Sequence, residues 1–168
     1  MSAVSLRPYL PADAPLCAEI FRASIELSAS DDYSDEQRDA WAALADDAAA
    51  FGARLSGALT LVALIDGEPL GFASLRGESE IDMLYVDPRF GRNGVASALI
   101  DALTRLAGAR GVEQLTGEAS DTARPLFERH GFVAQRRNLV QVDDQWLANT
   151  TMTKRLAPPN ETRAPTRH

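Results

Sequence analysis

The chain has one cysteine, Cys17, so no disulfide bond can form within it. We expect Cys17 to be a small buried residue of the first helix. No set of cysteine, histidine and acidic residues has the spacing of metal ligands, so no metal site is predicted. The longest uncharged apolar run, residues 58–65, is too short to cross a bilayer. The N-terminus also lacks the basic and apolar regions of a signal peptide, so we predict a cytoplasmic protein without a membrane partner.

Basic residues are in the minority, with 17 Lys and Arg against 24 Asp and Glu and a formal net charge of -7. A general nucleic-acid binder neutralises phosphates with basic side chains, so no nucleic-acid partner is predicted. The 168 residues suffice for one domain with its own core, and we find no internal repeat. We expect a domain over residues 1–157, followed by a polar tail over residues 158–168 that is predicted to be disordered.

The most informative stretch, residues 84–99, combines the end of an apolar strand, a loop with two glycines and the start of a helix. Pro88 ends the strand because it has no N–H to donate. A helix start presents unpaired N–H groups at the positive end of its dipole, and phosphate binds well there. Alone, the loop also fits an ordinary strand–helix connection. It matches neither the Rossmann fingerprint nor a P-loop.

Hydrophobic periodicity and turn residues predict the other elements. Asp13 is expected to cap the first helix, and Ser34 with Gln37 forms a capping-box pattern at the second. The dipeptides Asp66-Gly67 and Asp143-Asp144 predict tight turns between strands. Helices are expected over residues 14–27, 34–55 with Gly52 as an interruption, 95–108 and 122–129. Strands are expected over residues 4–9, 59–65, 69–75, 80–86, 113–118, 132–142 and 146–156.

The element order and three segments resemble the GNAT superfamily of N-acetyltransferases. In the loop, Gly94 and Ala96 match the acyl-CoA pyrophosphate pattern Gln/Arg-x-x-Gly-x-Gly/Ala, whereas Gly91 replaces the usual Gln or Arg. Residues 123–132 resemble the Ala-x-x-Leu-Tyr-Glu-x-x-Gly-Phe segment, and residues 147–156 resemble the closing strand. Residues 32–41 are similar to a bacterial subgroup of acetyltransferases. The resemblance implies an α/β (α+β) GNAT fold with a mixed, mostly antiparallel sheet flanked by helices.

The resemblance also implies acetyl-CoA as co-substrate. Backbone N–H groups from Arg92 to Ser97 would bind the pyrophosphate, and the side chain of Arg92 would add a charge-assisted contact. The end of the preceding strand would pair with pantetheine as an added strand does. The expected cofactor-binding residues are Leu84, Tyr85, Val86, Gly91, Arg92, Asn93, Gly94, Val95, Ala96 and Ser97.

Transfer to an amine needs a base, because deprotonating an alkylammonium of pKa about 10.4 at pH 7 costs about 4.6 kcal/mol. Glu80 and Asp82 lie two apart on one predicted strand, so their carboxylates share a face about 6–7 Å apart. In parts of the GNAT superfamily a glutamate at the position of Glu80 is the general base, and Asp82 is the second choice. Two solvated carboxylates are the alternative, and a bulge, typical of the family in this strand, would re-aim them.

Several other residues lie at positions that bear on the reaction or on the packing of the fold. Ser120 stands where the family often has a polar residue near the thioester, and it also fits a cap of the next helix. Phe127 replaces the family's usual general acid, a tyrosine, so solvent or another group must protonate the CoA thiolate. Tyr85 and Tyr33 are candidates, although aromatic packing in the core or in a lid is the favoured interpretation of each. His130 is expected to be a surface residue at a helix end.

The segment from Asp31 to Asp47 carries seven acidic residues and a single arginine. In the GNAT fold the first two helices wall the acceptor site, so this charge favours a cationic acceptor, unless it is only a solvated face. We predict an enzyme that moves an acetyl group from acetyl-CoA to a primary amine of a small molecule or peptide. A non-catalytic acyl-CoA-binding sensor or partner protein is the alternative, and a nucleotide-binding α/β protein is a second one. A homodimer is left open.

Overall fold

The structure, a computed structural model, describes residues 3–90 and 94–156. The strands of this part of the chain form one sheet in the order β1-β2-β3-β4-β5-β7-β6, antiparallel throughout except that β4 and β5 are parallel. The prediction of a mixed, mostly antiparallel sheet is confirmed. The strands are β1 (Val4–Pro8), β2 (Leu59–Ile65), β3 (Glu68–Arg76), β4 (Glu80–Val86), β5 (Gln114–Ser120), β6 (Val133–Val142) and β7 (Gln145–Arg155).

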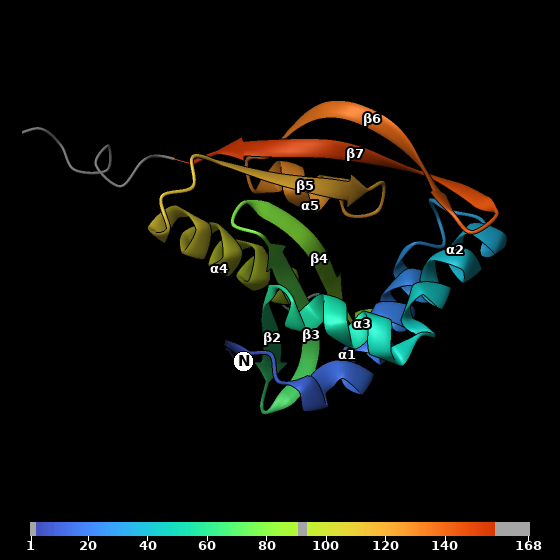
Figure 1. The fold of residues 1–168 in the computed structure, drawn as a ribbon, viewed down its shortest axis with the longest axis horizontal. Helices are drawn as coiled ribbons and strands as arrows, with labels where there is room; N and C mark the ends of the chain where they lie inside the picture. The colour runs from blue at the N-terminus through green and yellow to red at the C-terminus, as the bar shows by residue number, and fades with distance from the viewer. Residues whose placement is uncertain (1–2, 91–93, 157–168) are drawn as a thin grey trace, which may run out of the picture.

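Helices cover both faces of the sheet (Figure 1). On one face, α1 (Ala14–Ala23), α2 (Asp35–Ala42) and α3 (Ala48–Ser56) surround a core that includes Phe21, Phe51 and Phe72. On the other face, α4 (Val95–Ala109) and α5 (Arg124–Arg129) bury a second core around Leu99, Leu103 and Phe127. Short helical turns connect these elements: η1 (Pro11–Asp13), η2 (Ser24–Ser28), η3 (Ala43–Ala45) and η4 (Pro88–Phe90).

Several local predictions are confirmed. Ser34 Oγ accepts from the backbone N–H of Gln37, and Gln37 Oε1 accepts from the N–H of Ser34, which completes the capping box of α2. Asp66 and Gly67 both have positive φ, 54° and 79°, in the two-residue turn between β2 and β3. Cys17 is fully buried in α1, and burial raises the pKa of its thiol to about 12.

Two helix predictions are wrong in detail. The helix expected over residues 34–55 is interrupted at η3 and not at Gly52, which lies inside α3. A new helix begins there because Asp47 accepts from the N–H of Ala50 and acts as an N-cap. Asp13 does not cap α1 with its side chain. Its carboxylate instead accepts from the Leu10 N–H and forms a bidentate pair with Arg7 at 2.8 and 2.9 Å.

The parallel strands β4 and β5 pair only at their beginnings. Glu80 lies opposite Thr116 and Ile81 opposite Gly117, and no later residue of β4 pairs with β5 in the described part of the chain. In Figure 1 the layer of β5, β7 and β6 diverges from β4 beyond this point. The divergence leaves one backbone edge of β4 open and separates the two halves of the sheet where the candidate site lies.

Candidate active site

Two cavities meet at the divergence of β4 and β5. The first, which we call the strand cavity, has a volume of about 300 Å³ and lies between β4, β5 and the β6–β7 hairpin. The second, the helix cavity, has a volume of about 490 Å³ and extends to the start of α4. The residues that line both cavities mark their junction: Trp41, Leu84, Tyr85, Ser120 and Ala123.

The start of α4 forms one end of the helix cavity. Gly94 has φ 81°, a left-handed conformation that L side chains rarely adopt, and its C=O accepts the first helical bond, from Ala98 N–H. The N–H groups of the first turn therefore have no acceptor within the helix. Of the residues expected to bind the cofactor, Leu84, Tyr85, Val86, Gly94, Val95, Ala96 and Ser97 line this cavity. Gly91, Arg92 and Asn93 lie outside the described residues.

A glycine in β3 lets α4 approach the sheet. A Cβ placed on Gly71 would lie 2.8 Å from Cγ1 of Val95 and 3.1 Å from the carbonyl oxygen of Tyr85. Real Cβ atoms do not approach other atoms so closely, so only glycine fits here. The sequence signal was a lone glycine inside a predicted strand, which is typical of a close approach by another segment.

The helix cavity also includes a turn that periodicity did not predict. After α1 the chain widens into a π-helical turn, η2, whose Ser24, Ile25 and Ser28 line the cavity. In this turn Ile25 is buried, whereas Leu27, the last residue of the helix expected over residues 14–27, is 55% exposed. π-Helical turns are frequent at functional sites, and a period of 3.6 residues cannot reveal them.

His130 lies at the end of a helix, as expected, but its side chain is held by two hydrogen-bond partners. It follows α5, and its side chain is only 16% exposed. Its Nε2 lies 3.0 Å from Ser97 Oγ, and its Nδ1 lies 3.0 Å from Asp101 Oδ1. Because Ser97 lines the helix cavity, His130 is connected to the candidate cofactor site through that hydroxyl.

A β-bulge shapes the floor of the strand cavity. Ser74 pairs with Met83 and Leu75 with Ile81, so Asp82 is an extra residue in β4. Residues two apart normally share a face of a strand. Here Ile81 packs in the core under α4, whereas Met83 packs in the core under α1 and α3. The expected bulge is confirmed, and the spacing of Glu80 and Asp82 alone therefore does not determine where their carboxylates point.

Two arginines hold these carboxylates. Arg54 of α3 donates from Nε and Nη2 to Asp82 at 2.8 and 2.9 Å, and Arg76 of β3 donates to Glu80 at 2.8 Å. Arg76 Nη1 also lies 3.6 Å from Asp82 Oδ1, so it joins both carboxylates. Burial raises the pKa of Asp82, but the Arg54 hydrogen bonds and the charges of both arginines hold it below its ordinary value. Asp82 is thereby kept ionised and is a weak base.

Two tyrosines lie near the junction in different situations. Tyr33 donates its hydroxyl proton to the carbonyl of Ala148 at 2.6 Å and accepts from the N–H of Asp121 at 2.9 Å, so its proton is already used. Burial raises the pKa of Tyr85 to about 12, against a smaller opposing effect of its hydrogen bond with Trp41. Tyr85 therefore keeps its proton at neutral pH, and it lines both cavities.

Ser120 and Phe127 both line the strand cavity. Ser120 lines both cavities and its Oγ also accepts from the N–H of Ala123 at 3.1 Å, so the two interpretations of this residue are compatible. Phe127 lines the strand cavity and packs so close to β5 that a Cβ on Gly117 would lie 2.8 Å from Cε2 of its ring. Its ring offers no proton to the cavity.

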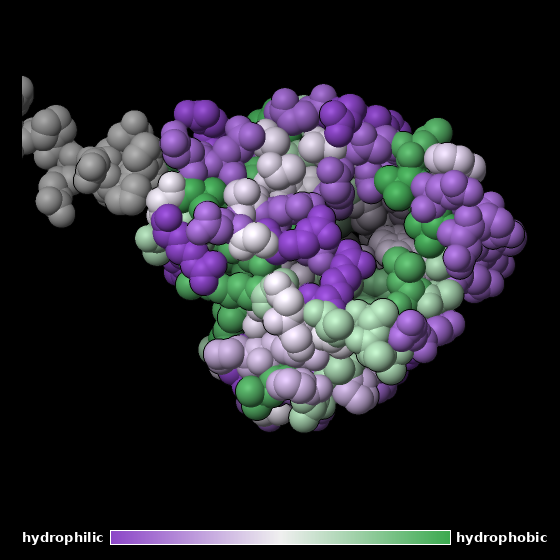
Figure 2. All heavy atoms as spheres, viewed as in Figure 1, coloured by the Kyte–Doolittle hydropathy of each residue, from purple (hydrophilic) through white to green (hydrophobic). Residues whose placement is uncertain are grey.

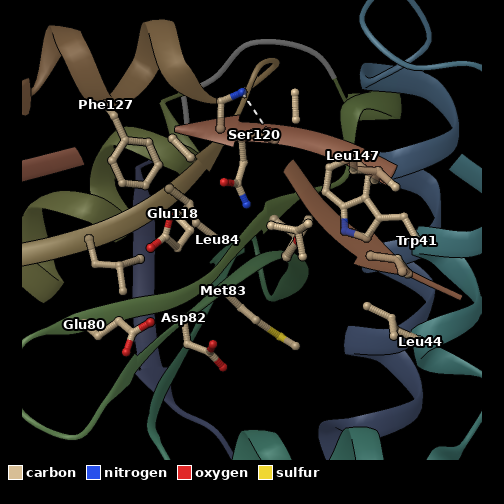
Figure 3. Close-up of a pocket in the computed structure, with 18 of the residues that line it drawn as sticks. Trp41, Leu44, Glu80, Asp82, Met83, Leu84, Glu118, Ser120, Phe127 and Leu147 are labelled. Atoms are coloured by element: carbon tan, nitrogen blue, oxygen red, sulfur yellow. Dashed lines mark hydrogen bonds between the residues drawn. The ribbon is translucent and has the colours of Figure 1, made fainter. Parts of the chain in front are cut away.

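Sequence reasoning missed Glu118 of β5. Its carboxylate lines the strand cavity together with those of Glu80 and Asp82 (Figure 3). Its Oε2 accepts from Thr151 Oγ1 at 2.8 Å and from Asn138 Nδ2 at 3.1 Å. The pairing of β4 with β5, which brings Glu118 to the same cavity as Glu80 and Asp82, joins segments far apart in the chain, and no local pattern reveals it.

The segment of residues 31–47 does line the strand cavity, but contrary to expectation none of its acidic side chains is in the lining. The residues that it contributes to the lining are Tyr33, Trp41 and Leu44. Several acidic residues have local roles instead. Asp32 accepts from Thr122, Asp46 pairs with Arg22, and Asp47 caps α3.

Comparisons with known proteins identify the family. A family model described as an acetyltransferase (GNAT) domain matches residues 29–156. The chain belongs to the GNAT acetyltransferase family. It is 38% identical over 152 residues, 90% of this chain and 96% of the other, to the uncharacterized N-acetyltransferase YafP of Escherichia coli. The activity of the chain is accordingly acetyl-CoA-dependent N-acetyl transfer.

Solved structures agree with this assignment. A crystal structure from Rhodopseudomonas palustris, described as a GCN5-related N-acetyltransferase and as a class-II aminotransferase, is 58% identical with a TM-score of 0.91, covering 93% of this chain and 98% of the other. The PaiA N-acetyltransferase of Thermoplasma acidophilum, solved with coenzyme A, has a TM-score of 0.76 at 16% identity, covering 92% and 99%, and shows the shared fold. Among the described residues of this GNAT protein, no helix is long and apolar enough to span a membrane.

Proposed function

We propose that acetyl-CoA binds in the helix cavity with its thioester at the junction, and that a primary amine of a small molecule or peptide enters through the strand cavity. The observation that carries this proposal is the meeting of the two cavities at Leu84, Tyr85 and Ser120. A donor on one side and an acceptor on the other can then react directly, without a covalent enzyme intermediate.

The cofactor would be held mainly by backbone groups. The first-turn N–H groups of α4, from Val95 to Ser97, suit the pyrophosphate because they lie at the positive end of the helix dipole. The open edge of β4 at Leu84–Val86 offers N–H and C=O groups to the amides of pantetheine, as an unpaired strand does to an added strand. Gly91, Arg92 and Asn93 lie in the sequence between these two proposed contacts, so we include them in the proposed cofactor site.

In the reaction, the amine nitrogen forms a bond with the acetyl carbonyl carbon and the C–S bond of the thioester breaks. The incoming ammonium must first lose a proton, and Glu80 is our first choice of base. Asp82 is a weaker choice because Arg54 and Arg76 stabilise its ionised form. Its proposed role is to hold Arg76 beside Glu80, since Arg76 contacts both carboxylates.

The CoA thiolate receives a proton at the end of the reaction. Tyr85 lies at the junction and can donate a hydrogen bond to the developing charge. Its pKa of about 12 lies above the value of about 8.5 for a thiol, so complete transfer from the phenol is unfavourable. We propose that Tyr85 stabilises the thiolate and that solvent completes the protonation, while Ser120 supplies a second hydroxyl near the thioester.

The test has two arms. Calorimetry with CoA, NAD and ATP determines which ligand binds, and release of free CoA thiol from acetyl-CoA measures turnover with a panel of small amines, peptides and aminoglycosides. Micromolar CoA binding with turnover of at least one amine supports the proposal. Tight CoA binding without turnover of any amine contradicts it in favour of a non-catalytic acyl-CoA-binding protein. Preference for NAD or ATP contradicts both.

A further inference from the structure

The two sides of the strand cavity differ in character. One side is formed by hydrophobic side chains from α2, η3, β6 and β7, among them Trp41, Leu44 and Leu147. The other side is formed by charged side chains of β3, β4, β5 and α3. Figure 2 shows a hollow with hydrophilic residues on one side and hydrophobic residues on the other. In Figure 3, Trp41, Leu44 and Leu147 lie across the cavity from Glu80 and Asp82.

The hydrophobic side is partly aromatic. The Trp41 ring lies edge-on to Tyr33, with ring centroids 5.3 Å apart, and 6.3 Å from the Tyr85 ring. Leu44 is 44% exposed and Val140 of β6 is 40% exposed, although both line the cavity. Apolar surface held open to solvent in this way gains free energy when an apolar group covers it.

The charges on the other side nearly cancel. Five charged residues line the cavity, two arginines and three carboxylates. Arg54 is paired with Asp82, and Arg76 with Glu80. In residues 3–90 and 94–156, no cation pairs with Glu118, whose hydrogen-bond partners are the neutral Thr151 and Asn138. The cavity therefore carries one negative charge that no arginine, lysine or histidine of the described chain neutralises.

From this arrangement we infer that the acceptor is a monoamine: one primary ammonium group on a hydrophobic body of about the size of a phenyl ring. This inference rests on the proposed function and narrows its acceptor. The hydrophobic body covers Trp41, Leu44 and Val140, and the ammonium is attracted by Glu118 before it loses its proton. A polyamine or an aminoglycoside would bring several positive charges to a cavity in which only one carboxylate, that of Glu118, has no cationic partner among the described residues. The acidic residues of 31–47 would not compensate the remaining charges, because they do not line the cavity.

The inference is tested by steady-state kinetics with acetyl-CoA and three amines: 2-phenylethylamine, ethylamine and spermidine. The value of kcat/KM for 2-phenylethylamine is expected to exceed that for ethylamine by about 10–100-fold, the effect of removing a phenyl-sized apolar group from water. The kcat/KM value for spermidine is expected to be the lowest of the three, although spermidine carries the most positive charge. Ethylamine matching 2-phenylethylamine, or spermidine exceeding both, overturns the inference while leaving acetyl transfer itself intact.

Two pairs of variants locate the effect. Glu118→Gln retains an oxygen for Thr151 and is expected to raise KM for 2-phenylethylamine about three- to tenfold at low salt, with KM for acetyl-CoA unchanged. Its control is Glu36→Gln, which removes an exposed acid outside the cavity. Val140→Ser is expected to reduce the preference for 2-phenylethylamine over ethylamine, whereas Leu139→Ser, its exposed neighbour outside the lining, is not.

If Glu118→Gln and Glu36→Gln have equal KM values for 2-phenylethylamine, Glu118 does not receive the ammonium and the inference fails. Circular dichroism of each variant checks that the fold is retained. Failure of the proposed function is distinguishable from failure of this inference, because it appears as no CoA binding, or as no turnover of any of the three amines by the wild-type protein.

Discussion

The Nε2 atom of His130 lies 3.0 Å from the Oγ atom of Ser97. The other ring nitrogen lies 3.0 Å from Asp101, one turn further along α4. The imidazole of His130, at the end of α5, thus contacts two side chains of α4, and one of them, Ser97, lies in the first turn, where the proposed phosphate site lies. The direction of the Ser97 hydroxyl is set by a residue that does not itself line the cavity.

This relationship predicts that His130 acts on CoA binding through Ser97. We expect His130→Ala and Ser97→Ala each to weaken CoA binding about three- to tenfold, measured by calorimetry. The double variant should lose no more than the more affected single variant, because residues that act through one contact are not additive. His130→Gln, which can still hydrogen-bond to Ser97, should recover part of the loss. Fully additive losses would show that the two residues act separately.

Gly94→Asp is expected to weaken CoA binding at least 100-fold. The new carboxylate would stand at the phosphate site, and hydrogen bonds to charged groups contribute roughly 1.5–3 kcal/mol each, so the loss of two accounts for this factor. Gly67→Asp is a matched control, because Gly67 has nearly the same φ, 79° against 81°, and the same open surroundings in a remote hairpin. Near-wild-type affinity in a folded Gly94→Asp protein would remove this loop from the site.

Glu80→Gln is expected to lower kcat at pH 7 by a factor of 10² to 10⁴, the usual contribution of a general base. Acetyl-CoA binding should change little, since Glu80 does not line the helix cavity. The deficit should shrink as the pH rises toward the pKa of the amine, because neutral amine then arrives without a base. A kcat close to that of the wild type at pH 7 would exclude Glu80 as the base.

Asp82→Asn is expected to destabilise the protein by about 1–3 kcal/mol at neutral pH, because it leaves Arg54 without its bidentate partner. The native pKa of Asp82 lies below the ordinary value of 3.8, so its ion pair stabilises the fold above that pH. As the pH falls through the native pKa, Asp82 is protonated and the stabilisation is lost. Urea unfolding from pH 7 to pH 3 should show the wild-type advantage shrinking below about pH 4. An advantage that is independent of pH would contradict this ion pair.

Tyr33→Phe separates a structural from a catalytic hydroxyl. The change leaves the Ala148 carbonyl and the Asp121 N–H without their partner, which should cost about 1–3 kcal/mol of unfolding free energy. Because the proton of Tyr33 is already donated to Ala148, kcat at saturating substrate should stay within about threefold of the wild type. Denaturant unfolding and steady-state kinetics measure the two effects. A 100-fold fall in kcat with unchanged stability would instead identify Tyr33 as the acid.

Much of the backbone follows from local signals in the sequence. The turn at Asp66-Gly67 depends on two residues that tolerate positive φ, and the capping box of Ser34 and Gln37 depends on side chains three positions apart. The strand, glycine loop and helix of residues 84–99 also depend on short-range chemistry. Proline ends the ladder, glycine accepts the left-handed conformation, and apolar spacing defines one helical face. These effects act between residues only a few positions apart, so they can be predicted from the linear sequence.

The chemistry of the site depends on contacts between residues far apart in the chain, and only the tertiary structure decides these. Arg54 forms an ion pair with Asp82, 28 positions further along the chain, and this pair helps to hold the pKa of Asp82 below its ordinary value and so weakens it as a base. The extra residue in β4 arises from its register with β3, which strand periodicity does not specify. Glu118 lines the cavity because β5 pairs with β4, a strand far away in the chain, and the acidic residues of 31–47 are absent from the lining although their segment contributes Trp41 to it. Local propensity sets the elements, but which charges meet is determined by how those elements pack.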